Sequence, residues 1–212
     1  MMNVLVVKAN NRPATEGISS RMYEVFMEEA RKVSDIELNT FDVFAEDMPY
    51  FGQDFFNAMG KTAQGVELND IEQRILAAST KAMDAFMAAD TVVFAFPLWN
   101  QTIPAALQTF IDYIYRAGVT FKYTENGPVG LVPEKKVIIL NARGGDYSTP
   151  QMAPLEMSVN YVKQIMNLFG IQQIEEVIIE GHNQYPDRAE EIVSEGMERV
   201  KASAGKLSPV HA

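Results

Sequence analysis

The chain of 212 residues is long enough for one domain with a sizeable core, because 47% of its residues are hydrophobic and 22% are charged. A formal net charge of −10 argues against nucleic acid and anionic membranes as partners, since both require a basic surface. There is no cysteine, and the two histidines, His182 and His211, are too few for a histidine-based metal centre. The first residues enter a strand without a basic and apolar signal region. We therefore expect a single domain over residues 1–212 that stays in the cytoplasm and binds no metal.

The first third of the chain predicts two strands, a helix and two long connections. Residues 3–8 are an apolar run typical of a strand, and residues 9–18 form an aperiodic loop that leads to a helix opened by a serine cap at Ser19-Ser20. Residues 36–43 alternate between apolar and polar, which predicts an edge strand with one solvated face. Residues 54–67 are rich in aromatic side chains but have no stable period, so we expect a mobile, irregular connection near the site.

The middle of the chain predicts a long helix, a buried strand and a second helix. The helix runs from about residue 70 to 89, and the strand at 91–97 is an apolar run without alternation, typical of a strand buried on both faces. The next helix, at 104–115, begins with a proline, which suits a first helical turn. Residues 116–130 predict a loop or small hairpin, with Asn126-Gly127 as its tight turn. The apolar side of the long helix consists of Ile71, Ile75, Leu76, Met83, Phe86 and Met87.

The last third predicts two more strands, at 136–141 and 174–180, and two more helices, at about 154–169 and 187–202. Five strands alternating with about five helices indicate a three-layer α/β fold with right-handed crossovers, in which helices cover both faces of a parallel sheet. We expect the flavodoxin-like strand order 2-1-3-4-5, because there are five strands and no G-x-G-x-x-G follows the first.

In this strand order, the loops after the first, third and fourth strands meet in one crevice. The first loop brings Ser19 to a helix amino terminus, where backbone N–H groups and the helix dipole favour a phosphate. The third-strand loop offers Trp99 as a flat wall and Asn100 as a donor and acceptor, and the fourth-strand loop offers the backbone of Gly144 and Gly145. A phosphate, a flat ring and a polar ring edge describe a mononucleotide flavin better than an adenine nucleotide.

Each of these residues also has a purely structural interpretation. Ser19 could be a simple helix cap, Trp99 a core residue, and Gly144-Gly145 only a turn. His182 is a lone histidine after a strand, and a structural hydrogen bond is the better prediction for it than catalysis. Their coincidence at three strand ends favours the ligand-binding interpretation.

Four segments resemble the FMN-dependent NADH-azoreductases, which belong to the flavodoxin-like quinone reductases. These are residues 4–10, 96–100 (Phe-Pro-Leu-Trp-Asn), 116–128 and 142–145 (Ala-Arg-Gly-Gly), and the resemblance extends from about residue 3 to 200. It implies one non-covalently bound FMN per subunit and a ping-pong reduction of quinones and azo compounds by NADH or NADPH. The FMN contacts that it implies are Asn10, Gly17, Ile18, Ser19, Pro97, Leu98, Trp99, Asn100, Gln101, Ala142, Arg143, Gly144 and Gly145.

We expect no catalytic side chain, because hydride passes between nicotinamide, flavin and acceptor while the protein positions them. The resemblance also implies a homodimer, and the aromatic cluster of Phe51, Phe55, Phe56 and Met59 independently predicts an interface that completes the site. Two other functions remain open. One is a flavodoxin-type electron carrier that serves protein partners, although residues 10–17 lack the compact Thr, Ser and Gly composition of its phosphate loop. The other is a binding module without flavin.

Overall fold

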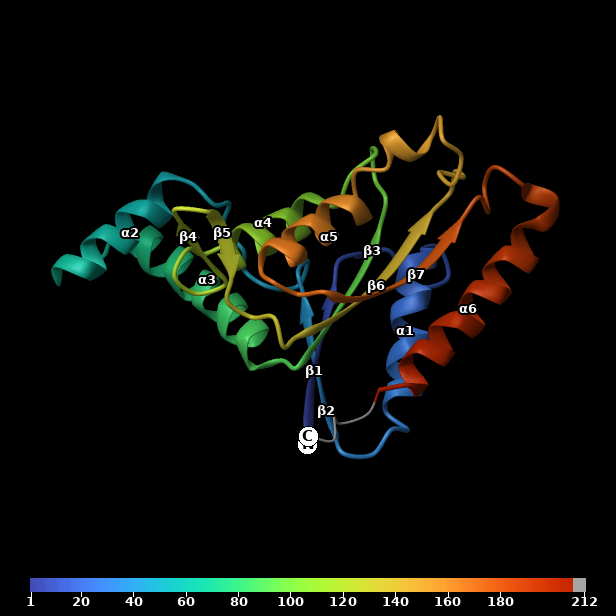
Figure 1. Cartoon of the computed structure of the whole chain (residues 1–212), viewed down its shortest axis with the longest axis horizontal. Coiled ribbons are helices and arrows are strands. Elements are labelled where there is room, and N and C mark those ends of the chain that lie inside the picture. The colour runs from blue at the N-terminus through green and yellow to red at the C-terminus, as the bar shows by residue number, and fades with distance from the viewer. Residues whose placement is uncertain (208–212) are drawn as a thin grey trace.

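The computed structural model describes residues 1–207, which form a central sheet, a small hairpin and helices on both sides of the sheet (Figure 1). The strands are β1 (Met2–Lys8), β2 (Ile36–Asp42), β3 (Thr91–Pro97), β4 (Phe121–Thr124), β5 (Gly127–Gly130), β6 (Lys136–Arg143) and β7 (Gln173–Glu180). The helices are α1 (Ile18–Ala30), α2 (Gln53–Gln64), α3 (Asp70–Ala88), α4 (Ala105–Ile114), α5 (Val159–Leu168) and α6 (Ala189–Gly205), with 3₁₀ turns η1 (Ala153–Leu155) and η2 (Pro186–Arg188). His211 lies outside the described residues.

The central sheet has the order β2-β1-β3-β6-β7, and all of its strand pairs are parallel. This is the predicted order 2-1-3-4-5 once the separate β4–β5 hairpin is left out of the count, so the flavodoxin-like prediction is confirmed. The hairpin predicted within residues 116–130 is also present, and Gly127 follows its turn with a φ of 104° that glycine adopts without strain.

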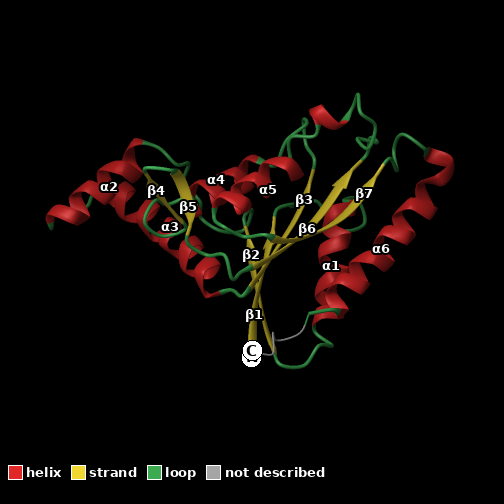
Figure 2. Cartoon of the chain, viewed as in Figure 1, coloured by secondary structure: helices red, strands yellow, loops and turns green. Residues whose placement is uncertain are grey.

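Three layers follow from the burial of β3 on both of its faces. All seven of its residues are buried, and their side chains alternate between two cores. Val92, Phe94 and Phe96 pack with α3, α4 and α5, whereas Val93 and Ala95 pack with α1 and α6. Figure 2 shows α1 and α6 side by side on one face of the sheet, with the other helices across it. The absence of alternation in the apolar pattern of residues 91–97 is explained by this two-sided burial.

The prediction of an irregular connection over residues 54–67 is wrong, because residues 53–64 form α2. The helix buries only Phe55 and Ala58, and the rings of Phe51, Phe55 and Phe56 pack together at its start. Gly65 ends it in the left-handed conformation with a φ of 68°. Large apolar side chains occur only in the first half of α2, at Phe55, Phe56 and Met59, so the sequence offers no apolar face that repeats along the whole helix.

Other helix boundaries also differ from the prediction. Gly17 is the N-cap of α1, so Ser19 and Ser20 lie inside its first turn and the predicted serine cap is wrong. Pro104 is the N-cap of α4 instead of its first helical residue, and Ile71 and Met87 on α3 are exposed instead of buried. The two C-terminal helices, α5 and α6, begin later than predicted because η1 and η2 precede them. Within residues 1–207, no helix combines the length and apolarity needed to span a bilayer.

Candidate functional site

The loops that follow β1, β3 and β6 meet at the carboxyl edge of the sheet, which is the upper edge in Figure 1. Their backbones are joined directly to neighbouring strands. Ala9 N–H donates to the carbonyl of Ala95 at 2.9 Å, and Leu98 N–H donates to the carbonyl of Ala142 at 2.9 Å. The structure therefore brings the three predicted loops together, as the strand order requires.

The first loop is built around a buried amide, Asn10, which folds the chain onto the start of α1. Asn10 Nδ2 donates to Ser19 Oγ at 2.8 Å, and Asn10 Oδ1 accepts from the N–H of Arg12 at 3.0 Å. Ser20 Oγ donates to the Arg12 carbonyl at 2.7 Å. No side chain caps α1, so within the described residues its first backbone N–H groups have no acceptor. This end of α1 is suited to an anion that accepts those hydrogen bonds.

The second loop is a tight turn between Trp99 and Thr102, whose backbone N–H and carbonyl groups pair with each other at 3.0 Å in both directions. Asn100 and Gln101 form its two central residues, with φ values of 50° and 68°. Left-handed backbone costs a non-glycine residue about 1–2 kcal/mol, and consecutive instances of this kind cluster at functional sites. Trp99 itself is half-buried and stands edge-on to Phe44, with ring centroids 6.2 Å apart.

A cleft of about 890 Å³ lies on one side of this turn. Trp99 and Asn100 line it together with aromatic side chains from the segment after β2 and polar side chains from α4. Burial raises the pKa of Asp112 above its ordinary value, against the hydrogen bond from Gln108, which lowers it. This cleft was not predicted from the sequence, because its walls come from two stretches that are far apart in the chain, residues 43–51 and 99–112. Its wall residues include Phe44, Met48, Tyr50, Phe51, Thr102, Ile103, Gln108, Thr109 and Asp112.

The third loop contains Gly144 and Gly145 and is packed against the loop after β7. The carbonyl of Gly144 accepts hydrogen bonds from the N–H groups of Asn183 at 3.0 Å and Gln184 at 3.1 Å. A Cβ at Gly144 would lie 2.3 Å from Asn183 Nδ2, so this approach depends on glycine. Within residues 1–207, the N–H groups of Gly144 and Gly145 have no acceptor and are available to a ligand.

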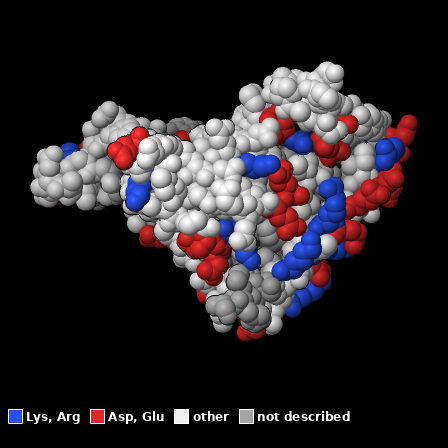
Figure 3. Space-filling view, in the orientation of Figure 1, with Lys and Arg blue, Asp and Glu red and all other residues white. Residues whose placement is uncertain are grey.

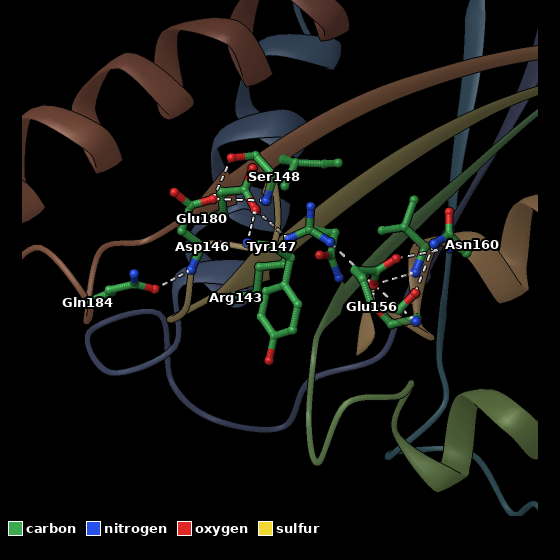
Figure 4. Close-up of polar contacts among 12 residues, drawn as sticks. Arg143, Asp146, Tyr147, Ser148, Glu156, Asn160, Glu180 and Gln184 are labelled. Atoms are coloured by element: carbon green, nitrogen blue, oxygen red, sulfur yellow. Dashed lines mark hydrogen bonds and ion pairs between the residues drawn. The ribbon is translucent and has the colours of Figure 1, made fainter. Parts of the chain in front are cut away.

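The Arg143 side chain points into the protein and is only 7% exposed (Figure 4). Its Nε donates to Glu180 Oε2 at 3.0 Å, its Nη1 lies 3.3 Å from Glu156 Oε1, and its guanidinium lies 5.4 Å from the ring centre of Tyr147. The side chain of Arg143 is thus engaged by the protein, and its carbonyl accepts a hydrogen bond from Gly181 N–H at 3.2 Å. Neither carboxylate was selected from the sequence, since no local motif connects them to Arg143.

The other predicted residues lie near strand ends, at the start of α1 or in the loop after β7. Pro97 and Ala142 are opposite each other at the ends of β3 and β6, and both are buried. Ile18 is the first residue of α1. His182 is half-buried, and burial lowers its pKa. Among the described residues its Nδ1 has no hydrogen-bond partner, so the predicted structural hydrogen bond is not found at that atom. Residues 1–207 contain no group of three or more histidine or acidic side chains arranged to hold a metal ion.

This fold and site agree with comparisons with known proteins. Residues 2–204 match the model of a protein family that has the flavodoxin-like fold. FMN-dependent NADH:quinone oxidoreductase 1 of Bacillus cereus is 51% identical over 208 residues, which cover 98% of this chain and all of that protein. The chain belongs to the family of FMN-dependent NADH:quinone oxidoreductases.

One more relative and two solved structures are similar to this chain over nearly their whole length. FMN-dependent NADH:quinone oxidoreductase 1 of Bacillus subtilis is 47% identical over 208 residues, covering 98% of this chain and 100% of that protein. The crystal structure of an azoreductase from Bacillus anthracis superimposes with a TM-score of 0.91 at 47% identity, covering 98% of this chain and 100% of that chain. A second azoreductase of that species, solved in complex with FMN, shares the fold with a TM-score of 0.86 at 24% identity, covering 97% of this chain and 99% of that chain.

Proposed function

We propose that this protein is an FMN-dependent oxidoreductase that uses NADH to reduce quinones and azo compounds. The observation that carries the proposal is the convergence, at one edge of the sheet, of an uncapped helix terminus, an aromatic wall and a pair of glycine N–H groups. Relatives that match the whole chain are named as oxidoreductases, which does not favour the alternative of a flavodoxin-type electron carrier.

The residues at the three loops fit FMN. The phosphate fits the amino terminus of α1, where unpaired N–H groups and the positive end of the helix dipole lie beside Asn10 and Ser19. The ring fits beside Trp99 and the turn at Asn100, and its polar edge fits the N–H groups of Gly144 and Gly145. When bound, FMN supplies two-electron hydride chemistry. The loops bind and orient it, and their N–H donors stabilise negative charge at its edge.

We propose a ping-pong reaction, because a flat slot beside one ring face serves a nicotinamide and a planar acceptor in turn. The first product must leave before the second substrate enters, so initial rates with NADH and a quinone as varied substrates should give parallel double-reciprocal lines. Intersecting lines would contradict this order. Rates with NADPH in place of NADH test the donor, and a panel of quinones and azo dyes tests the acceptor range.

We also propose a homodimer. α2 exposes Phe56 and Met59, and the β4–β5 hairpin exposes Tyr123 and Val129. Figure 3 shows that charged side chains gather around α6, whereas the surface over α4 and α5 is largely uncharged. Apolar groups exposed together commonly mark an interface. Sedimentation should give a dimer, and a monomer that keeps full activity on dilution would refute it.

We also propose that the enzyme is located in the cytoplasm, and cell fractionation tests this location.

The cofactor has a direct test. The purified protein should be yellow, and acid extraction followed by chromatography should release FMN, because the chain has no cysteine for covalent attachment. Release of FAD, or no flavin even after reconstitution with FMN, would overturn the proposed function. Catalytic turnover with NADH and a quinone separates an enzyme from an electron carrier, for which only slow, non-catalytic reduction is expected.

A further inference from the structure

Glu156 is a buried carboxylate between η1 and α5 that does not line the cleft, and the one predicted FMN-contact residue with which it pairs is Arg143. We propose that Glu156 is a positioning residue that holds the third loop of the site against the second. The proposal rests on the function proposed above and extends it to a residue outside the three loops. Glu156 is attached to the start of α5 and to Arg143, and its neighbour Met157 is attached to the turn at Gln101.

The first attachment fixes Glu156 itself. Its Oε1 accepts hydrogen bonds from the N–H groups of Ser158 at 3.0 Å and Val159 at 2.9 Å and from the Ser158 hydroxyl, and its Oε2 accepts from Asn160 N–H at 3.2 Å. These N–H groups lie at the amino terminus of α5, where the helix dipole also favours an anion. Burial acts to raise the pKa of Glu156, but the hydrogen bonds from Ser158, Val159 and Asn160 hold it below its ordinary value. Glu156 is therefore an anion in a fixed position.

The second attachment joins this anion to the third loop. Glu156 Oε1 lies 3.3 Å from Arg143 Nη1, while Glu180 Oε2 accepts from Arg143 Nε at 3.0 Å and from Tyr147 N–H at 2.9 Å (Figure 4). The buried guanidinium thus donates a hydrogen bond to Glu180 and forms an ion pair with Glu156, since Nη1 itself has no hydrogen-bond partner within residues 1–207. Gly144 is the next residue after Arg143, so the direction of the Gly144-Gly145 backbone depends on this pairing.

The third attachment joins the same segment to the second loop. Met157 N–H, next to Glu156 in the chain, donates to the carbonyl of Gln101 at 3.1 Å. Gln101 is the second left-handed residue of the turn beside Trp99, a conformation that persists only where its surroundings support it. Because buried polar networks have few alternative arrangements, one residue with four accepted hydrogen bonds can set the relative position of two ligand-binding loops.

The test compares Glu156→Gln with Glu176→Gln. Glu176 lies on β7 and pairs with Lys163 of α5, but it contacts neither loop, so its substitution removes a carboxylate that interacts with the same helix without the proposed effect. We expect Glu156→Gln to weaken FMN binding by about 10-fold or more, in the range found when groups that orient ligand-contacting residues are lost. At saturating FMN it should also change the visible circular dichroism of the bound ring, and in the apoprotein it should speed amide exchange at residues 98–101 and 143–147. The Glu176→Gln protein should match the wild type in all three.

The outcomes separate the two proposals. A wild-type protein that binds no FMN refutes the proposed function. A wild-type protein that binds FMN, together with a folded Glu156→Gln variant that matches Glu176→Gln in affinity, dichroism and exchange, refutes the positioning role alone. If Glu156→Gln does not fold, Glu156→Asp decides the question. It keeps the charge at the start of α5 but shortens its reach to Arg143, so we expect faster exchange at 143–147, and unchanged exchange there overturns the inference.

Discussion

Substitution of Gly17 by alanine should weaken FMN binding without unfolding the protein. A Cβ on Gly17 would lie 3.0 Å from Asn10 Nδ2, 3.2 Å from Ser20 Oγ and 3.3 Å from Arg12 Cβ. These contacts are closer than ordinary van der Waals contact, and the neighbours must move by a few tenths of an ångström. Asn10 and Ser20 are both buried and hydrogen-bonded, to Ser19 Oγ and to the Arg12 carbonyl, so neither can turn away freely.

The expected size of the effect follows from these contacts. Overpacking of a buried site costs about 1–3 kcal/mol. The φ of Gly17 is −111°, which alanine adopts without strain, so a smaller entropic gain of about 0.4–1 kcal/mol opposes that cost. The displacement falls on the hydrogen bond between Asn10 and Ser19, which is worth about 0.5–1.5 kcal/mol. We therefore expect the variant to fold and to bind FMN about 10-fold more weakly, which corresponds to about 1.4 kcal/mol.

Titration of the apoprotein with FMN measures this affinity, and Trp99 is a convenient reporter because it is the single tryptophan of the chain. Gly52→Ala is the matched control. Gly52 has a φ of −176°, which any residue adopts, and a Cβ there would meet nothing within 4 Å. Affinity that is unchanged in Gly17→Ala, with a folded protein, would refute the assignment of the phosphate to the start of α1.

Three further predictions concern stability. Gly130→Ala should destabilise the protein by about 3 kcal/mol, because its Cβ would lie 2.1 Å from the backbone of residues 169 and 170. Gly60→Ala on exposed α2 should instead stabilise it by about 0.5–1 kcal/mol. A urea midpoint that does not fall for Gly130→Ala, or does not rise for Gly60→Ala, would contradict the respective prediction. Asn69→Ala should cost about 1 kcal/mol in the same assay, because the Asn69 side chain accepts from Glu72 N–H at 2.9 Å in the capping box of α3, and an unchanged midpoint would refute that role. Burial, followed by the charge of Asp47, raises the pKa of Tyr113 to about 12, so its contribution to stability is complete below the ordinary value of about 10 and is lost as pH rises through about 12. Tyr113→Phe should flatten the fall in melting temperature over this alkaline interval, and an equal slope in both proteins would refute it.

The sequence by itself determined the layered fold and the place of the site. Continuous apolar runs such as residues 91–97, which are too short for a helix, indicate strands buried on both faces, and their alternation with helices implies a parallel sheet. The position of the site follows, because parallel strands end together. The three loops were therefore found from local pattern alone, whereas the identity of the cofactor came from resemblance in segments such as 96–100 and 142–145.

The tertiary structure decided which side chains meet. Arg143 and Glu180 are 37 positions apart, and no local sequence motif predicts that they pair. No motif predicts either that Glu156 accepts hydrogen bonds from the first N–H groups of α5. The left-handed turn at residues 100–101 is likewise hidden from the sequence, because asparagine tolerates this conformation but glutamine disfavours it, and contacts such as that with Met157 N–H support it. α2 was missed for the same reason, since most of its residues are exposed and its position depends on packing with α3. The periodicity of apolar residues shows which face of a single helix or strand is buried. Which side chains of two different elements pair depends on how the tertiary structure brings those elements together.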